Sequence, residues 1–382
     1  VKKVFEELIN NRLGVFKTPF KHQVQALENF AHGKNLFVAT GTGSGKTECF
    51  MWPILYKLID EVLNSKQSWN QRGVRAMLIY PMNALVSDQI ARLRSIIGDE
   101  DNKFLSILTK YAGDIRRPQF GMYTGRTQYP GNHLSRSINL QIAESYEKSY
   151  LIQDDLTEDE KAVKRKDIEG LKKIHKYPAK NMATFVEALK NNTLDKYDSS
   201  NDAELMLRYE MQQHTPDILI TNYSMLEYLL IRPTDESLIS QEGLSKLRFM
   251  VLDEAHIYRG ALGIEISYLM RRLIAMAQKA PQFILTSATL GKGPEDLDKI
   301  INFAKNITSV DFKEEDVIFG KRFKYEQNRR FCIDVADYSS LLDNINNLEE
   351  GKRIISKYIG YDDNLSLLSN LYHLLSLLLY NH

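Results

Sequence analysis

The sequence feature that most restricts the fold is the segment NLFVATGTGSGKTECF, which runs from Asn35 to Phe50. Residues 36–39 form an apolar run typical of a buried strand, and a loop with three glycines follows. Lys46 and Thr47 then open a stretch with helical character. Glycines allow backbone N–H groups to point inward at a helix N-terminus, where the helix dipole also favours an anion. The segment therefore predicts a phosphate-binding loop between a strand and a helix.

The alternation of strand and helix continues along the chain. Residues 46–63 and 83–97 have the periodicity of helices. This order favours an α/β fold with a mainly parallel sheet that helices cover on both faces. Each predicted strand ends in a polar cluster, and such sheets bind their ligands at the carboxyl ends of the strands. Besides the first strand at 35–39, the predicted strands are residues 75–81, 216–222, 249–255 and 283–289.

Residues 128–214 differ in composition from the predicted sheet region. This stretch is rich in Lys, Glu and Asp, as in QDDLTEDEKAVKRKDIEGLKKIHK, and predicts helices and loops without a strand. We interpret it as an insertion within a domain that spans residues 1–310. The insertion is either a clamp for nucleic acid or a partner, or a solvated helical elaboration, and its charge pattern favours the second interpretation.

Residues 311–382 predict the start of a second, mostly helical module. Its most apolar segment, Leu365–Tyr380, has 16 residues and contains Asn370 and His373. A membrane-spanning helix needs about 20 apolar residues. We therefore expect a buried helix here and no association with a membrane.

Composition narrows the classes of partner and compartment. The 382 residues include 50 Lys and Arg against 49 Asp and Glu, which gives a formal net charge of +1. A nucleic-acid surface would therefore have to be a local patch. Cys49 and Cys332 lie far apart in the sequence and lack metal-ligand spacing. We expect no disulfide framework or zinc site, and the reducing cytoplasm fits best.

The residue types of the glycine-rich loop indicate how it would hold a triphosphate. Lys46 would reach the β- and γ-phosphates, and the Thr47 hydroxyl would take one place on Mg²⁺. One departure from the general phosphate-loop pattern is Thr40, which replaces the first glycine. The predicted backbone contacts to phosphate come from Thr42, Gly43, Ser44 and Gly45.

A second motif, FMVLDEAH at residues 249–256, is an apolar strand that ends in Asp253 and Glu254. Successive residues at a strand end point in different directions, so two adjacent carboxylates suit two tasks. We expect Asp253 to hold Mg²⁺ and Glu254 to orient or deprotonate the attacking water. Alone, this motif would also fit an exposed acidic turn. Together with the phosphate loop, it predicts a catalytic site.

Three motifs in this order, ATGTGSGKT, LDEAH and TSATL, resemble the motor core of the second helicase superfamily, the DEAD/DEAH-box class. The resemblance implies a RecA-like domain that binds ATP and Mg²⁺. Gln23 in FKHQVQAL precedes Lys46 by 46 − 23 = 23 residues, the family's usual interval for its adenine contact. His256 falls where the family bridges its nucleotide and strand sites, and Ser287 and Thr289 fall in its coupling motif. Ordinary structural roles remain open for these last three residues.

Three other segments resemble the loops with which this family holds a nucleic-acid strand: YPMNALVSDQ, YTGRT and ITNYSML. Small and hydroxylated residues at strand ends leave N–H and O–H groups free for phosphate oxygens. Arg126 would add a guanidinium. Each residue could instead serve as a turn or a cap. The candidate strand contacts are Asn83, Thr124, Gly125, Arg126, Thr221 and Asn222.

Two longer segments, PDILITNYSMLEYLLIRP and VLDEAHIYRGALGIEISYLMRRL, resemble one bacterial subgroup of this class. Its members carry a C-terminal domain of unknown function and include DNA-repair helicases and helicase components of phage-defence systems. The resemblance favours DNA over RNA as the nucleic-acid partner. It also implies protein partners from a defence system.

The family's Gln-x-x-Gly-Arg-x-Gly-Arg signature, which belongs to a second RecA-like domain, is absent from the sequence. We therefore expect the ATP-binding half of a longer helicase or translocase, which alone hydrolyses ATP slowly. The charged insertion and the near-neutral charge leave open a nucleotide-gated nucleic-acid sensor or assembly platform. Another phosphate-loop enzyme, such as a kinase, is disfavoured because TSATL and the strand loops would then have no role.

Overall fold

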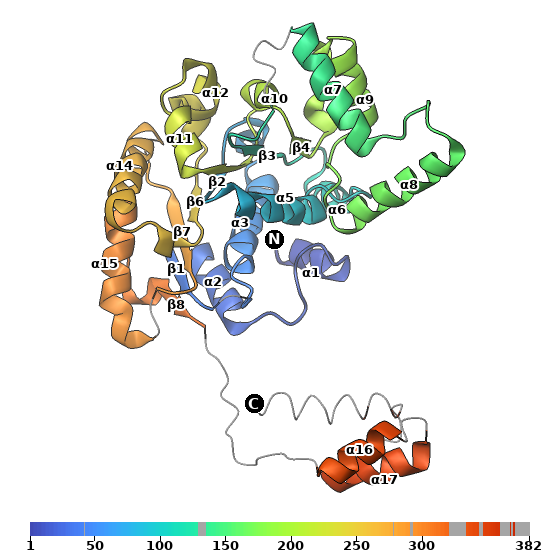
Figure 1. The fold of residues 1–382 in the computed structure, drawn as a ribbon. Coiled ribbons are helices and arrows are strands. Elements are labelled where there is room, and N and C mark those ends of the chain that lie inside the picture. The colour runs from blue at the N-terminus through green and yellow to red at the C-terminus, as the bar shows by residue number, and fades with distance from the viewer. Residues whose placement is uncertain are drawn as a thin grey trace. The chain divides into compact units, whose positions relative to one another are not determined.

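The computed structural model describes residues 1–41, 43–128, 135–277, 279–290, 293–320, 334–343 and 347–359, together with Leu367 and Asn370. The chain divides into two compact units, Val1–Gly320 and Lys321–His382. The first unit is built on an eight-stranded sheet with the order β4-β3-β5-β2-β6-β7-β1-β8 (Figure 1). Its strands are β1 Leu36–Ala39, β2 Ala76–Tyr80, β3 Phe120–Tyr123, β4 Glu204–Leu205, β5 Ile218–Asn222, β6 Phe249–Leu252, β7 Gln282–Ser287 and β8 Val317–Phe319.

Each pair of neighbouring strands in this sheet is parallel, which confirms the predicted α/β fold. Alternate residues of a strand point to opposite faces, and here both faces are apolar. In β2, Ala76, Leu78 and Tyr80 enter one hydrophobic core, whereas Met77 and Ile79 enter the other. The sheet is therefore buried between two layers of helices (Figure 1).

The helices of the first layer come from the N-terminal third of the chain, and those of the second come from the end of the insertion and from the chain after it. The first layer contains α1 Lys2–Asn10, α2 Lys21–Ala31, α3 Glu48–Asn64, α4 Lys66–Asn70, α5 Asn83–Ile96 and α6 Lys103–Ala112. The second layer contains α10 Arg208–Gln213, α11 Tyr223–Leu229, α12 Glu236–Ile239, α13 Gln241–Leu244, α14 Gly260–Ala277 and α15 Leu297–Thr308.

The five predicted strands are confirmed as β1, β2, β5, β6 and β7, whereas β3, β4 and β8 were not predicted. The prediction of a strand-free insertion is wrong, because β4 lies within residues 128–214 and pairs with β3. The sheet also continues past residue 310, since β8 pairs with β1 and the first unit reaches Gly320. β4 and β8 have two and three residues, too few for a periodicity to show.

The insertion has a small hydrophobic core of its own, separate from those of the sheet. The core lies mainly between α7 Arg136–Tyr150 and α9 Met182–Lys190, and it includes Ile142 and Phe185. By contrast, α8 Glu158–Lys173 buries none of its residues, as expected for a solvated charged helix.

The second unit contains α16 Val335–Asp343 and α17 Leu348–Tyr358, whose core includes Leu341, Ile354 and Ile355. The predicted helix at Leu365–Tyr380 lies outside the described residues except for Leu367 and Asn370. Among the helices that the structure describes, none combines the length and the apolar character needed to cross a membrane.

Candidate nucleotide site and strand-binding loops

The parallel sheet brings the three nucleotide motifs to one edge. β6, β7 and β1 are neighbours in the sheet, so the segments after their carboxyl ends meet. The backbone N–H of Thr40 donates to the carbonyl of Ser287 over 3.1 Å. Thr286 Oγ1 donates a hydrogen bond to Asp253 Oδ1. The phosphate loop, the acidic motif and the TSATL segment are therefore in direct contact.

The phosphate loop has a backbone shape that depends on its glycines. Gly43 and Gly45 have φ angles of +72° and +74°, a region that other residues rarely adopt. Ser44 Oγ lies 2.7 Å from both Thr40 Oγ1 and the Gly41 carbonyl oxygen, which closes the loop on itself. The loop is thus shaped by its own hydrogen bonds. Thr42, which we also predicted to contact phosphate, lies outside the described residues.

Thr40, the departure from the general pattern, is accommodated by a second glycine. A Cβ atom at Gly320 would lie only 2.8 Å from Thr40 Cγ2, so the missing side chain at position 320 makes room for the threonine methyl group. The Thr40 hydroxyl contacts Ser44. The residue that replaces the glycine is therefore part of the structure that holds the loop.

Lys46 and Glu254 meet across the site. Lys46 Nζ lies 3.2 Å from Glu254 Oε1, and the two side chains are 10% and 22% exposed. Glu254 has a φ angle of +49°, a left-handed conformation that costs an L-residue about 1–2 kcal/mol. This conformation breaks the direction of β6 after Asp253. It places the Glu254 carboxylate against Lys46 of the phosphate loop.

Asp253, the residue before Glu254, accepts two hydrogen bonds. Burial raises the pKa of the Asp253 carboxyl, and the hydrogen bond from Thr286 opposes that shift. The Glu254 N–H also donates to Asp253 Oδ1, over 3.0 Å. Both bonds are made to Oδ1. The geometry thus fixes the carboxylate while it leaves Oδ2 for another partner.

Thr286 is a functional candidate that the sequence pattern alone does not identify. Leu252 of β6 and Leu285 of β7 are partners in the ladder, so the next residues, Asp253 and Thr286, meet just beyond it. The motif TSATL contains Thr286, but only the pairing of β6 with β7 identifies its partner.

The side chains at this edge fit a Mg²⁺ ion bound together with a triphosphate. Thr47 lies directly before α3, and its hydroxyl does not cap that helix. A hydroxyl and a carboxylate such as Asp253 are hard oxygen ligands of the kind that Mg²⁺ prefers. Glu254 Oε2 is buried and has no hydrogen-bond partner among the described residues, and it lies 3.3 Å from His256 Nδ1. That oxygen can accept a hydrogen bond from a water.

Gln23 contacts the phosphate loop directly. Its Nε2 donates to the Gly45 carbonyl over 3.1 Å, and its Oε1 accepts from the Phe20 N–H over 2.9 Å. The neighbouring His22 Nε2 lies 2.8 Å from the Ser44 carbonyl oxygen. The structure therefore shows Gln23 as a support of the loop, and an adenine contact would have to share these groups.

An ion pair between a buried carboxylate and an exposed arginine lies at the start of α3, next to the phosphate loop. Glu48, the first residue of α3, is buried and forms an ion pair with Arg92 of α5. The pair balances a negative charge that would otherwise lie next to the anion site. Burial, and then Glu48, raise the pKa of the neighbouring Cys49 thiol to about 12. Cys49 is free, whereas Cys332 lies outside the described residues.

The three predicted strand-binding loops follow β2, β3 and β5, which are neighbours on the other half of the same sheet edge. Asn222 Nδ2 donates to Asn83 Oδ1 over 2.6 Å and so connects two of these loops. Asn222 also caps α11 through Met225 N. Gly125 and Arg126 are exposed at the tip of the remaining loop, the one after β3.

Two of the predicted strand contacts are buried. Thr221 is fully buried and its hydroxyl donates to the Tyr123 carbonyl, while Thr124 is 1% exposed. These threonines therefore have the structural role of a turn residue and hold the loops in place. Asn83, Gly125, Arg126 and Asn222 remain as predicted direct contacts.

Of the two coupling candidates, one is buried and one is exposed. Ser287 Oγ accepts hydrogen bonds from the N–H groups of Thr289 and Leu290 over 3.3 and 2.9 Å. It thus forms the turn at the end of β7. Thr289 lies exposed on this turn, where another domain can reach it.

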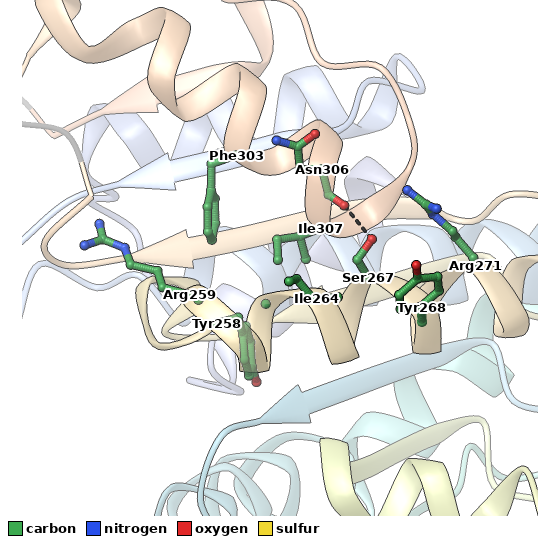
Figure 2. A pocket seen from close by; sticks show the side chains of 11 residues that line it. Tyr258, Arg259, Ile264, Ser267, Tyr268, Arg271, Phe303, Asn306 and Ile307 are labelled. Carbon is green, nitrogen blue, oxygen red and sulfur yellow. Dashed lines mark hydrogen bonds between the residues drawn. The ribbon is translucent and has the colours of Figure 1, made fainter.

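A groove of about 450 Å³ lies between α14 and α15, away from these motifs (Figure 2). Arg259 and Arg271 lie toward its two ends, with Ile264 and Phe303 between them. None of the predicted nucleotide-binding residues that the structure describes lines it. The candidate nucleotide site is therefore identified by its chemistry and not by the size of a cavity.

Comparisons with known proteins agree with the motifs. The model of the DEAD/DEAH box helicase family matches residues 20–130 and 169–297, more than half of the chain. The Druantia protein DruE of Escherichia coli (strain UMEA 4076-1) is 38% identical over 340 residues, 80% of this chain and 18% of DruE. An uncharacterized ATP-dependent helicase of Methanocaldococcus jannaschii is 30% identical over 115 residues, 29% of this chain and 16% of the relative.

Among solved structures, helicase Lhr of Mycobacterium smegmatis bound to ssDNA and AMP-PNP matches with a TM-score of 0.47 and 16% identity, over 93% of this chain and 35% of Lhr. The DUF1998 helicase MrfA bound to DNA and AMPPNP matches with a TM-score of 0.46 and 18% identity, over 84% of this chain and 29% of MrfA. The chain spans less than a fifth of the curated relatives described above. By the family match over most of its length, this chain belongs to the DEAD/DEAH box helicase family.

Proposed function

We propose that this chain is the ATP-binding half of a Mg-ATP-dependent helicase or translocase that acts on DNA. The observation that carries the proposal is the contact between Lys46 and Glu254, 3.2 Å apart, where the phosphate loop meets the acidic motif. The loops after β2, β3 and β5 lie on the same sheet edge. One edge therefore offers both a site for a triphosphate and a row of groups for a nucleic-acid strand.

In this proposal the phosphate loop binds ATP through its backbone N–H groups and Lys46. When bound, Mg²⁺ would neutralise phosphate charge, and Thr47 and Asp253 would hold it. Lys46 has to leave Glu254 to reach the phosphates, which frees the carboxylate to orient the attacking water. His256 Nδ1 lies 3.3 Å from Glu254 Oε2 and would steady that carboxylate by donating a hydrogen bond to it. Gln23 would read adenine while it keeps its contact with the loop.

The strand site and the nucleotide site would communicate through the sheet edge. Thr286 contacts Asp253, and the next residue, Ser287, forms the turn that carries Thr289. A shift of the metal ligand can therefore move the segment that faces a second domain. We propose that this domain is RecA-like and supplies arginines to the developing phosphate charge.

The choice of DNA rests on the subgroup motifs in the sequence, as do protein partners from a defence system. The backbone groups of the loops would contact DNA and RNA phosphates alike. Competition between single-stranded DNA and RNA of the same base sequence, measured on the full-length protein, tests this choice.

The test of the whole proposal is ATP hydrolysis by the full-length protein with and without single-stranded DNA. Stimulation by DNA that is lost in Lys46→Ala and in Glu254→Gln is the expected result. Unchanged turnover in both variants would contradict it. Normal biological function of a Glu254→Gln protein would instead favour a nucleotide-gated sensor that needs no hydrolysis.

A further inference from the structure

The loop after β3, Thr124–Thr127, is a turn whose two ends are buried and whose tip is exposed. Thr124 and Thr127 are 1% and 6% exposed, whereas Gly125 and Arg126 face solvent. The Thr124 N–H donates to Thr127 Oγ1 over 2.9 Å, and Thr127 Oγ1 donates to the Met122 carbonyl over 2.6 Å. The Arg126 N–H lies 3.2 Å from Thr124 Oγ1. These bonds leave the tip free for an outside partner.

One residue of the insertion holds both ends of this turn. Arg208, the first residue of α10, donates from Nη2 to the Thr124 carbonyl over 2.8 Å. Its backbone N–H donates to the Gln128 carbonyl over 3.1 Å. Its guanidinium also lies 5.3 Å from the centre of the Tyr123 ring. A charged donor to a carbonyl is stronger than a neutral one.

A second residue of α10 fixes the end of β3. Tyr123 is fully buried, and its hydroxyl donates to Asp235 Oδ1. Gln212 Nε2 donates to the same oxygen over 2.7 Å. Asp235 is 1% exposed, so it depends on these two donors. Burial, followed by the bond to Asp235, raises the pKa of Tyr123, which keeps its hydroxyl a donor.

The same hydrogen-bonded chain continues into the other strand-binding loops. Thr221 Oγ1 donates to the Tyr123 carbonyl over 2.7 Å, next to the carbonyl that Arg208 holds. Asn222 then donates to Asn83 over 2.6 Å. The insertion is thereby connected to the loops after β3, β5 and β2. A solvated elaboration without a role would not need these contacts.

We propose that the insertion positions the strand-binding turn, with Arg208 and Gln212 holding Thr124–Thr127 so that Gly125 and Arg126 meet a nucleic-acid strand. Arg208 and Gln212 act through the turn and touch no strand themselves. The inference rests on the proposed function, because it assumes that the tip contacts nucleic acid. It gives the insertion a task that its charged composition does not reveal.

The test compares Arg208→Ala and Arg208→Lys in the full-length protein, with Arg165→Ala as the control. Arg165 lies on the exposed helix α8 of the same insertion, and its loss removes the same charge. In Arg208→Ala we expect faster hydrogen–deuterium exchange at residues 124–128 and an about tenfold higher DNA concentration for half-maximal stimulation. Basal hydrolysis and turnover at saturating DNA stay unchanged. Arg208→Lys restores part of the affinity, and Arg165→Ala matches the parent.

The two readouts separate the inference from the proposed function. Unchanged exchange and unchanged affinity in Arg208→Ala overturn the inference. Faster exchange with unchanged DNA affinity also overturns it, because the turn would then be held by Arg208 without serving the strand. If the parent protein shows no stimulation by DNA at all, the proposed function fails, while exchange still reports whether Arg208 holds the turn.

Discussion

The ammonium group of Lys46 and the carboxylate of Glu254 lie 3.2 Å apart in a site where their side chains are 10% and 22% exposed. Each group is the counter-ion of the other. In the proposed function, a triphosphate would compete with Glu254 for Lys46, and the same step would release Glu254 for catalysis. The pair would thus connect binding of the nucleotide with its hydrolysis.

The first prediction concerns Glu254→Gln. The amide is a weaker partner for Lys46, so ATP should bind with equal or higher affinity, while turnover falls by about 10²–10⁴ because the general base is lost. Nucleotide titration and steady-state hydrolysis of the full-length protein measure the two effects. Glu265→Gln, at an exposed position of α14, is the control and should change neither. Weaker ATP binding in Glu254→Gln would contradict this account of the pair.

The second prediction concerns Thr286→Val, which removes the hydroxyl that donates to Asp253. A hydrogen bond to a charged group contributes about 1.5–3 kcal/mol, so turnover should fall by about tenfold or more. The Mg²⁺ concentration for half-maximal activity should rise, because the carboxylate is less well fixed. Titration of hydrolysis with Mg²⁺ checks both effects.

Thr308→Val is the matched control for Thr286→Val. Thr308 is also fully buried, but its hydroxyl bonds to the Ala304 carbonyl within α15, away from the site. If both variants lose activity equally, the effect comes from general destabilisation and the specific role of Thr286 is refuted.

The third prediction concerns Arg92→Ala. Glu48 has a side chain that is 8% exposed and pairs with Arg92, at the first turn of α3. Without Arg92 its uncompensated charge would repel phosphate, so ATP affinity should fall by about tenfold. The double variant Arg92→Ala/Glu48→Gln removes that charge and should recover most of the affinity in a nucleotide titration. A double variant as weak as Arg92→Ala would rule out repulsion as the cause.

The clustering of the nucleotide motifs could be predicted from the sequence, because parallel strands place their carboxyl ends at one edge. Apolar runs precede Lys46, Asp253 and Ser287 in the sequence. Once a parallel sheet is predicted, these residues are expected to lie close together at the carboxyl ends of its strands. The pairing of β6 with β7, by contrast, sets the contact between Thr286 and Asp253. A single sequence does not reveal which strands are neighbours.

The sequence also does not show which of the predicted strand contacts are buried and which are exposed. Thr221 and Arg126 both look like phosphate contacts, yet the first is fully buried and the second faces solvent. The short strands β4 and β8 carry too few residues for a pattern. The hydrogen bond from Arg208 to Thr124 joins residues 84 positions apart. Arg208 lies in the insertion, whose sequence shows only a charged composition and gives no sign of this contact.

The fourth prediction concerns the pH dependence of stability. Burial, and then Glu48, raise the pKa of the Cys49 thiol from 9.0 to about 12, so folding favours the neutral thiol. The stability that Cys49 contributes is therefore complete below pH 9 and is lost as the pH rises towards about 12. Cys49→Ala should lose less stability than the parent over this range, measured by denaturant unfolding at each pH. An identical decline in both proteins would show that Cys49 does not contribute.

The last prediction concerns Lys180, a fully buried residue of the insertion. Lys180 Nζ lies 2.5 Å from Asp202 Oδ2 and 2.6 Å from Glu210 Oε1, and both carboxylates are also buried. Lys180→Met would leave two unpaired negative charges, which should cost about 3–5 kcal/mol of local stability. Because Glu210 belongs to α10, the loss should also raise exchange in the Thr124–Thr127 turn that Arg208 holds.

Hydrogen–deuterium exchange of the full-length protein distinguishes this local effect from a global one. In Lys180→Met, exchange should rise in α9, α10 and the turn, while β1, β2 and β6 remain protected, because the insertion contributes only the buried residues Ala203, Leu205 and Met211 to their cores and most of its other buried apolar residues form a separate cluster. Adding Asp202→Asn removes one of the two unpaired charges and should recover part of the protection. Equal loss of protection in the insertion and in the central strands would show that the insertion is not an independent unit. Such a result would also mean that the contacts between the insertion and the Thr124–Thr127 turn cannot be weakened without unfolding the candidate nucleotide site.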